Sequence, residues 1–334
     1  MTAAAPSPPL LSVEGLTTEF WIGGGWHAAV RGVSFEVARN ETLAIVGESG
    51  CGKSITVMSL MRLLPETGCR SGADRLTLDG RSLTGLSEEE MRQLRGDRMA
   101  MIFQEPMTAL NPVLPIGLQI AEPLMFHRGM ALREARDVAR ALLDQVGIPA
   151  TSDRLDDYPH EFSGGMRQRV MIAMALACDP DLLLADEPTT ALDVTIQAQV
   201  LALLSDLKQA KGMGMILITH SLGVVAAVAD RVAVMYAGEI VETASVNELF
   251  ANPVHPYTEA LLRSIPRPDR DVDTVVPIAG SVPSIDRMPP GCRFAGRCPL
   301  ATPDCLAAPP PLVATGGTGH RAACWVRAGS GAAA

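Results

Sequence analysis

The sequence predicts an α/β fold with a mainly parallel core sheet, and three short apolar runs carry this prediction. The runs are Thr42–Val46, Asp181–Ala185 and Met215–Thr219. Continuous apolar runs of this length are typical of parallel strands that are buried on both faces. The first run ends at a glycine-rich loop, and a helical segment, Ile55–Leu64, follows until Pro65.

An antiparallel β subdomain and an inserted helical subdomain accompany this core. Leu10–Glu19 and Val33–Val37 alternate apolar and polar positions, as half-buried strands do. Prolines interrupt the start of residues 105–178, which then show helical spacing in Leu132–Val146 and Met166–Cys178. We expect a core domain over residues 1–265. Beyond it, prolines and cysteines predict a small Cys-rich C-terminal domain, residues 266–334.

Composition excludes several classes of protein. The hydrophobic content of 47% allows a sizeable core, and the net charge of −9 disfavours a dedicated nucleic-acid binder. No apolar run reaches the roughly 18 residues that span a bilayer, and the N-terminus lacks the pattern of a signal peptide. We therefore expect a cytoplasmic chain that meets a membrane only through its partners.

The segment between the first strand and its helix fits the pattern G-x-x-x-x-G-K-[ST]. Its residues are Gly47, Glu48, Ser49, Gly50, Cys51, Gly52, Lys53 and Ser54. Glycines let the backbone turn tightly, so that successive N–H groups face phosphate oxygens, and the helix N-terminus adds its dipole. Lys53 can reach the β- and γ-phosphates of a nucleotide, and the Ser54 hydroxyl can ligand Mg²⁺.

The second apolar run ends in two carboxylates, Asp186 and Glu187. After a strand in a phosphate-loop protein, the first acid is placed to hold Mg²⁺ and the second to polarise the attacking water. Upstream, Ser163, Gly164 and Gly165 precede a helix and predict a second anion-binding helix N-terminus.

In this order, the motifs resemble those of ABC transporter ATP-binding subunits. They are GESGCGKS, FQEP with Gln104, FSGGMRQR, LLLADEP, ALD over residues 191–193, and His220 after MILIT. The signature reads FSGGM where LSGGQ is commoner, which leaves Ser163 and Gly165 intact. The segment NPVHPYT, residues 252–258, and the Cys-rich tail resemble the oligopeptide/dipeptide importer branch. The phosphate-loop pattern and the resemblance together define the predicted class, a P-loop ABC ATPase.

The resemblance implies a mechanism and partners. Two ATPase subunits would close on ATP, with Ser163 and Gly165 acting on the partner's nucleotide and Asp193 crossing the interface. The second subunit would be a copy of this chain or a paralogue, and the family usually pairs two different ones. His220 would contact the γ-phosphate, and Gln104 would sense Mg²⁺ and water. Two membrane permeases and an extracytoplasmic solute-binding protein would complete the importer, with this chain peripheral on the cytoplasmic face of the inner membrane. Phe20, in the loop between the first strands, is the candidate for stacking on adenine, with Trp21 and Trp26 as rivals.

Four of the seven cysteines crowd the tail: Cys292, Cys298, Cys305 and Cys324. Their spacing lacks the C-x2-C pair of most zinc sites and suits a [4Fe–4S] cluster at least as well. Tail arginines would favour the thiolate form. The resemblance implies the same cluster. Zinc, free buried cysteines and two disulfides are the alternatives. Cys51 is a small residue with possible thiol reactivity.

Three alternative functions follow from the same residues. An importer of another solute, such as nickel, would carry the same ATPase motifs. A soluble ABC ATPase with nucleic-acid partners is disfavoured by the acidic charge and the NPVHPYT segment. A subunit that binds ATP without hydrolysing it is disfavoured by the presence of Glu187 and His220.

Overall fold

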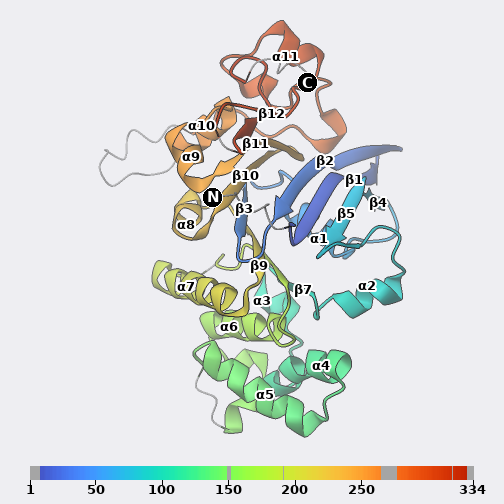
Figure 1. Ribbon diagram of the computed structural model, residues 1–334, viewed down its shortest axis with the longest axis vertical. Coiled ribbons are helices and arrows are strands. Elements are labelled where there is room, and N and C mark those ends of the chain that lie inside the picture. The colour runs from blue at the N-terminus through green and yellow to red at the C-terminus, as the bar shows by residue number, and fades with distance from the viewer. Residues whose placement is uncertain (1–7, 149–151, 191, 265–276, 318, 329–334) are drawn as a thin grey trace, which may run out of the picture. The chain divides into compact units, whose positions relative to one another are not determined.

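The computed structural model describes residues 8–148, 152–190, 192–264, 277–317 and 319–328 (Figure 1). The chain forms two compact units. The first unit comprises Met1–Leu11, Val37–Glu41 and Leu78–Ile218, and the second comprises Ser12–Glu36, Thr42–Thr77 and Thr219–Ala334. The predicted boundary near residue 265 lies outside the described residues.

The first unit contains a parallel sheet and a set of helices. Its strands are β7 (Met99–Ile102), β8 (Leu182–Asp186) and β9 (Gly214–Thr219), and β8 pairs with both others in parallel. Every residue of β8 and β9 is buried, as expected for strands that are covered on both faces. Both predicted strands are therefore confirmed, to within one residue.

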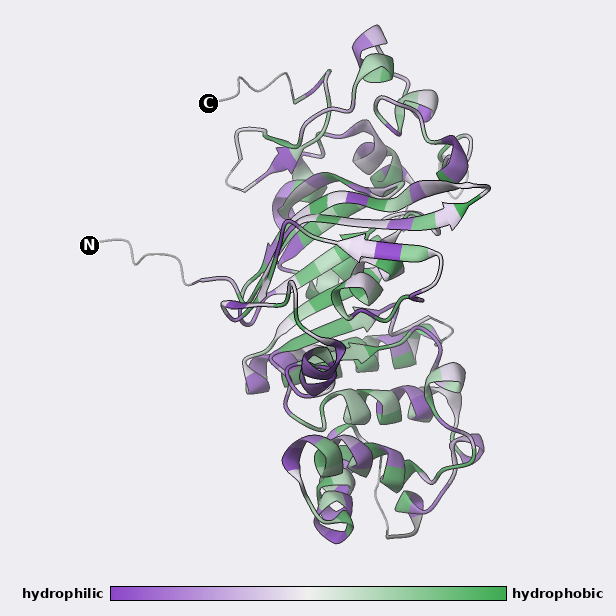
Figure 2. Cartoon of the chain, turned by 90° about the vertical axis from the view of Figure 1, so that its right-hand side faces the viewer, coloured by the Kyte–Doolittle hydropathy of each residue, from purple (hydrophilic) through white to green (hydrophobic). Residues whose placement is uncertain are grey.

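Most helices of the first unit lie between β7 and β9 in the sequence, and α2 (Glu88–Leu94) precedes β7. The others are α3 (Pro106–Ala109), α4 (Ile116–Arg128), α5 (Leu132–Gln145), α6 (Gly164–Ala175) and α7 (Val194–Lys211). Two 3-10 turns, η1 (Ser152–Leu155) and η2 (Pro159–Glu161), and the short strand β6 (Arg81–Ser82) complete the unit. Pro123 lies inside α4 and does not end it. In Figure 2 these helices carry both hydrophilic and hydrophobic residues.

The second unit contains an antiparallel sheet and part of a mixed one. β1 (Leu11–Ile22) lies between β2 (Gly25–Val37) and β5 (Arg75–Leu78), and β4 (Cys69–Gly72) also pairs with it. The predicted pair of N-terminal strands is confirmed, and both strands run longer than predicted. Phe20 lies within β1, and its predicted position in a loop is therefore wrong.

The mixed sheet of the second unit places the phosphate loop. Its order is β12 (Val313–Ala314), β13 (Arg321–Ala322), β11 (Glu239–Ser245), β10 (Arg231–Tyr236) and β3 (Thr42–Val46). β10 runs parallel to β3 and antiparallel to β11. The helices are α1 (Lys53–Leu60), α8 (Leu222–Val228), α9 (Val246–Ala251), α10 (Pro256–Arg263) and α11 (Pro303–Ala307), with 3-10 turns η4 (Ile285–Arg287) and η5 (Ala295–Arg297).

A separate Cys-rich C-terminal domain is not confirmed. β13 pairs with β11, so the described C-terminal strands extend the sheet that carries the phosphate loop. Phe294 and Cys292 belong to the same buried cluster as Val46 and Tyr236 of the sheet. The C-terminal region therefore shares its hydrophobic core with the rest of the second unit.

Candidate functional site

The phosphate loop runs from the end of β3 to the start of α1 and is shaped by close backbone approaches. A Cβ at Gly47 would lie 2.1 Å from the carbonyl oxygen of Met235, which no side chain could accept. Gly52 has a φ of 103° and would place a Cβ 2.9 Å from the Ala29 oxygen. Both positions therefore require glycine. Ser49 and Gly50 are exposed at the tip of the loop.

Lys53 is buried inside this loop, with 5% of its surface exposed. Its Nζ donates hydrogen bonds to the carbonyl oxygens of Gly47, at 2.9 Å, and Glu48, at 3.0 Å. The ammonium group is thus held within the loop at the N-terminus of α1. Ser54, in the first turn of the helix, is half-buried, and its hydroxyl oxygen suits the hard ion Mg²⁺.

Burial of Cys51 disfavours the thiol reactivity that the sequence left possible. The residue is buried, and this burial raises the pKa of its thiol although Lys53 acts in the opposite direction. A protonated thiol is a poor nucleophile, so Cys51 serves the loop as a small buried side chain. Its Sγ lies 3.8 Å from Lys53 Nζ.

The acidic strand end belongs to the first unit. Asp186 is the last residue of β8 and is 4% exposed. Glu187 follows with a φ of 46°, a left-handed conformation that costs a non-glycine residue on the order of 1–3 kcal/mol. Its N–H donates to the Ile218 oxygen of β9 at 3.0 Å, which holds the turn. Asp186 offers a carboxylate, a ligand that Mg²⁺ prefers.

Glu187 and Gln104 lie together, although 83 residues separate them in the sequence. Gln104 Nε2 donates to Glu187 Oε2 at 3.3 Å, and Thr190 Oγ1 donates to the same oxygen at 2.9 Å. The structure therefore fixes the Glu187 carboxylate from two sides. Thr190 was not among the residues that the sequence predicted for the site. Its position three residues after Glu187 was the one feature of the sequence that could have pointed to it.

The SGG segment caps a helix, as predicted, but α6 begins at Gly164 and not at Met166. Ser163 is the N-cap, and its Oγ accepts a hydrogen bond from the N–H of Met166 at 3.4 Å. A side-chain cap at this position lets the helix start immediately afterwards. Ser163 and Gly164 are exposed, so this helix N-terminus is open to an anion.

Two further predicted residues stand at element ends. Asp193 caps α7 by accepting from the N–H of Ile196 at 2.9 Å, and Ile196 Cγ2 would lie 3.1 Å from a Cβ at Gly165. Ile196 in the first turn of α7 thus lies against Gly165 of the signature, within the first unit. Ala191, of the same motif, lies outside the described residues. His220 is exposed and follows β9 directly.

The candidate adenine-binding aromatics differ in exposure. Phe20 is half-buried, whereas Trp21 and Trp26 are 52% and 37% exposed and contact each other at 5.4 Å between ring centroids. The Arg70 guanidinium lies 4.4 Å from the Trp26 ring centroid. All three aromatic rings come from β1 and β2.

The four tail cysteines lie in the second unit. Cys292, Cys305 and Cys324 are buried and Cys298 is half-buried, all as free thiols. Burial raises the pKa of Cys292 to about 11, with smaller contributions in the same direction from the other three thiols. The prediction that arginines favour the thiolate is therefore wrong for Cys292. Within the described ranges, no group of three or more His, Cys, Asp or Glu side chains could hold a metal ion.

The loop and the acidic strand end define the class of the protein. Loops of this shape hold the phosphates of a nucleotide, and a buried strand that ends in two acids supplies a metal ligand and a group that orients water. Each of these two features, taken by itself, is typical of a phosphate-loop nucleotide hydrolase. Among the residues that the structure describes, no helix is both long enough and apolar enough to cross a membrane.

Comparison with known proteins assigns the family. Residues 30–190 match the family described as ABC transporter, and residues 241–305 match the oligopeptide/dipeptide transporter, C-terminal region. A putative peptide import ATP-binding protein of Brucella melitensis is 50% identical over 321 residues, which cover 96% of each chain. The oligopeptide transport ATP-binding protein AppD of Bacillus subtilis is 51% identical over 97% of this chain and 98% of its own.

A solved structure agrees with these matches. The ATP-binding cassette MJ0796, in a dimeric post-hydrolysis state bound to ADP and Pi, has a TM-score of 0.63 and 27% sequence identity. The match covers 71% of this chain and 98% of that one. The chain belongs to the ABC transporter family, in its oligopeptide/dipeptide branch, and is an ATPase of that family.

Proposed function

We propose that this chain hydrolyses ATP to drive the import of di- or oligopeptides through a membrane transporter. The observation that carries the ATPase part is the fixed Glu187 carboxylate, which is one residue past the Asp186 ligand and is bonded by Gln104 and Thr190. The peptide part rests on the relatives, which are named for peptide import, and on the match over residues 241–305.

Each residue has a proposed role in this reaction. Lys53 and the loop N–H groups bind the β- and γ-phosphates, and Ser54 and Asp186 hold Mg²⁺ with Gln104 close to it. When bound, Mg²⁺ neutralises charge on the phosphates. Glu187 orients the attacking water, and His220 contacts the γ-phosphate. The nucleotide base stacks on Phe20, with Trp21 and Trp26 as the alternatives.

The exposed signature implies a second ATPase subunit. The helix dipole at Ser163 and Gly165 would face the γ-phosphate of the nucleotide held by the partner, and Asp193 would lie at that interface. We propose a paralogue as this partner, with two permeases and an extracytoplasmic solute-binding protein. This chain would then be peripheral on the cytoplasmic face of the inner membrane. We also propose the domain limits 1–265 and 266–334, with the helical subdomain at about 105–178 and with the C-terminal part packed onto the hydrophobic core of the second unit.

The Ser163→Arg variant tests the two-subunit mechanism. We expect the isolated chain to bind ATP as the wild type does, because its own phosphate loop is unchanged. Hydrolysis in the assembled transporter should fall by about a hundred-fold or more, because the bulky cation blocks the anion-binding helix N-terminus. Nucleotide titration and a phosphate-release assay check the two expectations. A loss of binding by the isolated chain equal to the loss of turnover would contradict the proposal.

The same variant tests the transported solute. Cells that carry only Ser163→Arg should lose the uptake of labelled oligopeptides, while cells that carry the wild-type chain retain it. Loss of nickel uptake with peptide uptake intact would assign the alternative importer. Co-purification with ribosomes or DNA in place of permeases would assign a non-transport ABC ATPase.

We also propose that the four tail cysteines bind a [4Fe–4S] cluster, which supplies a structural crosslink when bound. The support is the number of cysteines in the C-terminal region and the burial of Cys292, Cys305 and Cys324 there. The thiols as placed do not form a ligand group, so binding requires them to move together. No step of ATP hydrolysis depends on this proposal.

Iron analysis tests the cluster. Protein purified without oxygen should be brown and contain about four irons per chain, as a cubane requires. Replacing Cys298 by Ser should bleach it, whereas replacing Cys178, in the first unit, should not. Stoichiometric zinc would replace the iron–sulfur proposal, and protein without metal would refute both.

A further inference from the structure

The C-terminal region reaches the phosphate loop through Arg297. The Nη1 atom of Arg297 lies 3.0 and 3.1 Å from the two carboxylate oxygens of Glu48, and 3.3 Å from the Tyr236 hydroxyl. Nε donates to the Ala279 oxygen at 2.8 Å, and Nη2 donates to the Ile278 oxygen at 3.2 Å. The side chain is only 7% exposed. Its guanidinium is therefore fixed on every side that carries a donor.

The side chain of Tyr257 bonds to the backbone of the same loop residue, Glu48. The N–H of Glu48 donates to the Tyr257 hydroxyl at 2.9 Å. Tyr257 is fully buried, and its ring packs edge-on against Tyr236 at 4.7 Å and lies 5.4 Å from Phe294. The hydroxyl therefore cannot leave the loop without disturbing the aromatic core of the second unit.

The sequence His255-Pro256-Tyr257 explains how the Tyr257 side chain is oriented toward Glu48. His255 caps α10 by accepting a hydrogen bond from the Tyr257 N–H on Nδ1 at 3.1 Å. Burial lowers the pKa of His255 to about 3, so the ring is neutral and able to accept. The N–H of His255 donates to the buried carboxylate of Glu242 at 2.8 Å. The start of the helix is thereby fixed, and with it the tyrosine.

A second contact reaches the far side of the loop. The Arg293 guanidinium donates to the Ala237 oxygen, in the turn between β10 and β11. The next residue of that turn, Gly238, donates its N–H to the Cys51 oxygen at 2.8 Å. The C-terminal region thus acts directly on Glu48, and through one turn on Cys51.

Glu48 is held at all three of its polar groups. Its carboxylate pairs with Arg297, its N–H is bonded to Tyr257, and its carbonyl oxygen accepts from Lys53 Nζ. From these contacts we infer that Arg297 and Tyr257 are positioning residues for ATP, which set the peptide planes of the phosphate loop and the place of the Lys53 ammonium. This inference rests on the proposed ATP site and adds that its affinity depends on the C-terminal region.

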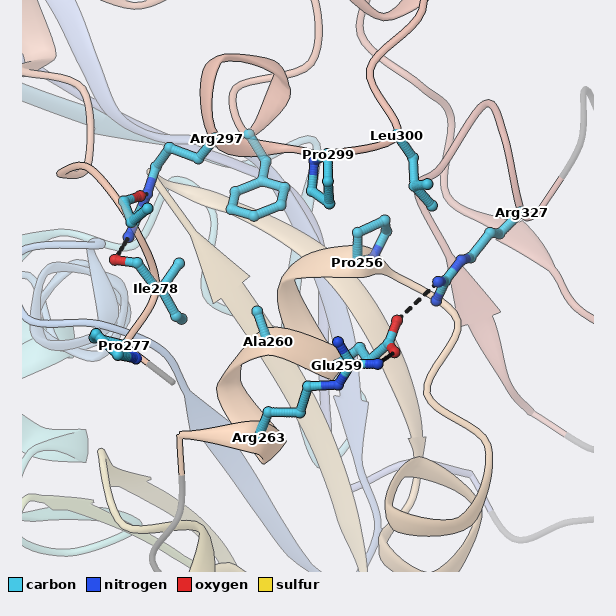
Figure 3. A pocket seen from close by; sticks show the side chains of 12 residues that line it. Pro256, Glu259, Ala260, Arg263, Pro277, Ile278, Arg297, Pro299, Leu300 and Arg327 are labelled. Carbon is cyan, nitrogen blue, oxygen red and sulfur yellow. Dashed lines mark hydrogen bonds and ion pairs between the residues drawn. The ribbon is translucent and has the colours of Figure 1, made fainter. Parts of the chain in front are cut away.

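Figure 3 shows Arg297 at the wall of a pocket of about 320 Å³ between α10 and the C-terminal region. Arg263 lines the same pocket, but its guanidinium pairs with Glu259 of its own helix and is 68% exposed. Both arginines thus line the pocket, and of the two only Arg297 bonds to the phosphate loop among the residues that the structure describes. Arg263→Ala is therefore a matched control.

Nucleotide titration of the full-length chain tests the inference. Arg297→Ala should raise the Kd for ATP about ten-fold, the effect of losing one buried, charge-assisted contact. Tyr257→Phe, which removes only the hydroxyl, should raise it about three-fold. Arg263→Ala should leave the Kd unchanged. In the assembled transporter, the KM for ATP should rise by the same factors while kcat is retained, because uniform binding is lost.

A double-variant cycle separates positioning from general stability. Once Glu48→Ala has removed the carboxylate, adding Arg297→Ala should weaken ATP binding no further. Variants that melt at a lower temperature yet bind ATP as the wild type does would show a merely structural contact and overturn the inference. If Arg297→Ala does not fold, the ATP affinities of Arg297→Lys and Tyr257→Phe are measured in its place, and wild-type affinity in both would overturn the inference. A wild-type chain that binds no ATP would instead refute the proposed function.

Discussion

The Glu187→Gln variant will bind ATP with the affinity of the wild type and lose its hydrolysis. The amide keeps the size of the side chain and one oxygen, which can still accept from Gln104 and Thr190. It cannot polarise the attacking water, and removal of such a group lowers the rate by about a hundred-fold or more. The assembled transporter should therefore accumulate ATP-bound, closed dimers.

Steady-state phosphate release by the assembled transporter measures this effect, with nucleotide titration to confirm binding. Glu66→Gln is the control, because Glu66 is an exposed carboxylate outside both the loop and the strand ends. If Glu187→Gln hydrolysed ATP at nearly the rate of the wild type, Glu187 would not be the residue that orients the attacking water. Its left-handed φ of 46° would then need another explanation.

Local sequence patterns were enough to predict the core strands of the fold. β3 and β8 are fully buried, and their continuous apolar residues leave little choice of element. Helix ends were less predictable. α1 ends at Leu60 and not at Leu64, because Arg62 takes a φ of 50° that no helix continues. α6 begins two residues before the predicted position, because the N-cap is made by Ser163 and apolar periodicity does not register a cap.

The contacts of the C-terminal region could not be predicted from local patterns. β12 and β13 have two residues each, which is too short for any periodicity to register. The bonds from Tyr257 and Arg297 to Glu48 span 209 and 249 residues of sequence. The same holds within the first unit for Gln104 and Glu187. Motif order placed these two in one site, but only the fold gives their hydrogen bond.

The Lys53→Ala variant will fail at the step before hydrolysis. The substitution removes the buried ammonium that we propose binds the β- and γ-phosphates, and also its hydrogen bonds to the Gly47 and Glu48 oxygens. Truncating one partner of a buried charge pair costs about 2–5 kcal/mol, which corresponds to a Kd for ATP raised by roughly 30-fold or more. Nucleotide titration of the full-length chain measures the change.

Lys211→Ala is the matched control. Lys211 is the last residue of α7 and its ammonium pairs with Asp179, so the substitution should leave the Kd for ATP unchanged. The comparison with Glu187→Gln separates the two halves of the reaction. Lys53→Ala should lose affinity, whereas Glu187→Gln should keep it and lose turnover. Equal ATP affinity in Lys53→Ala and the wild type would mean that the loop N–H groups bind the phosphates without the lysine.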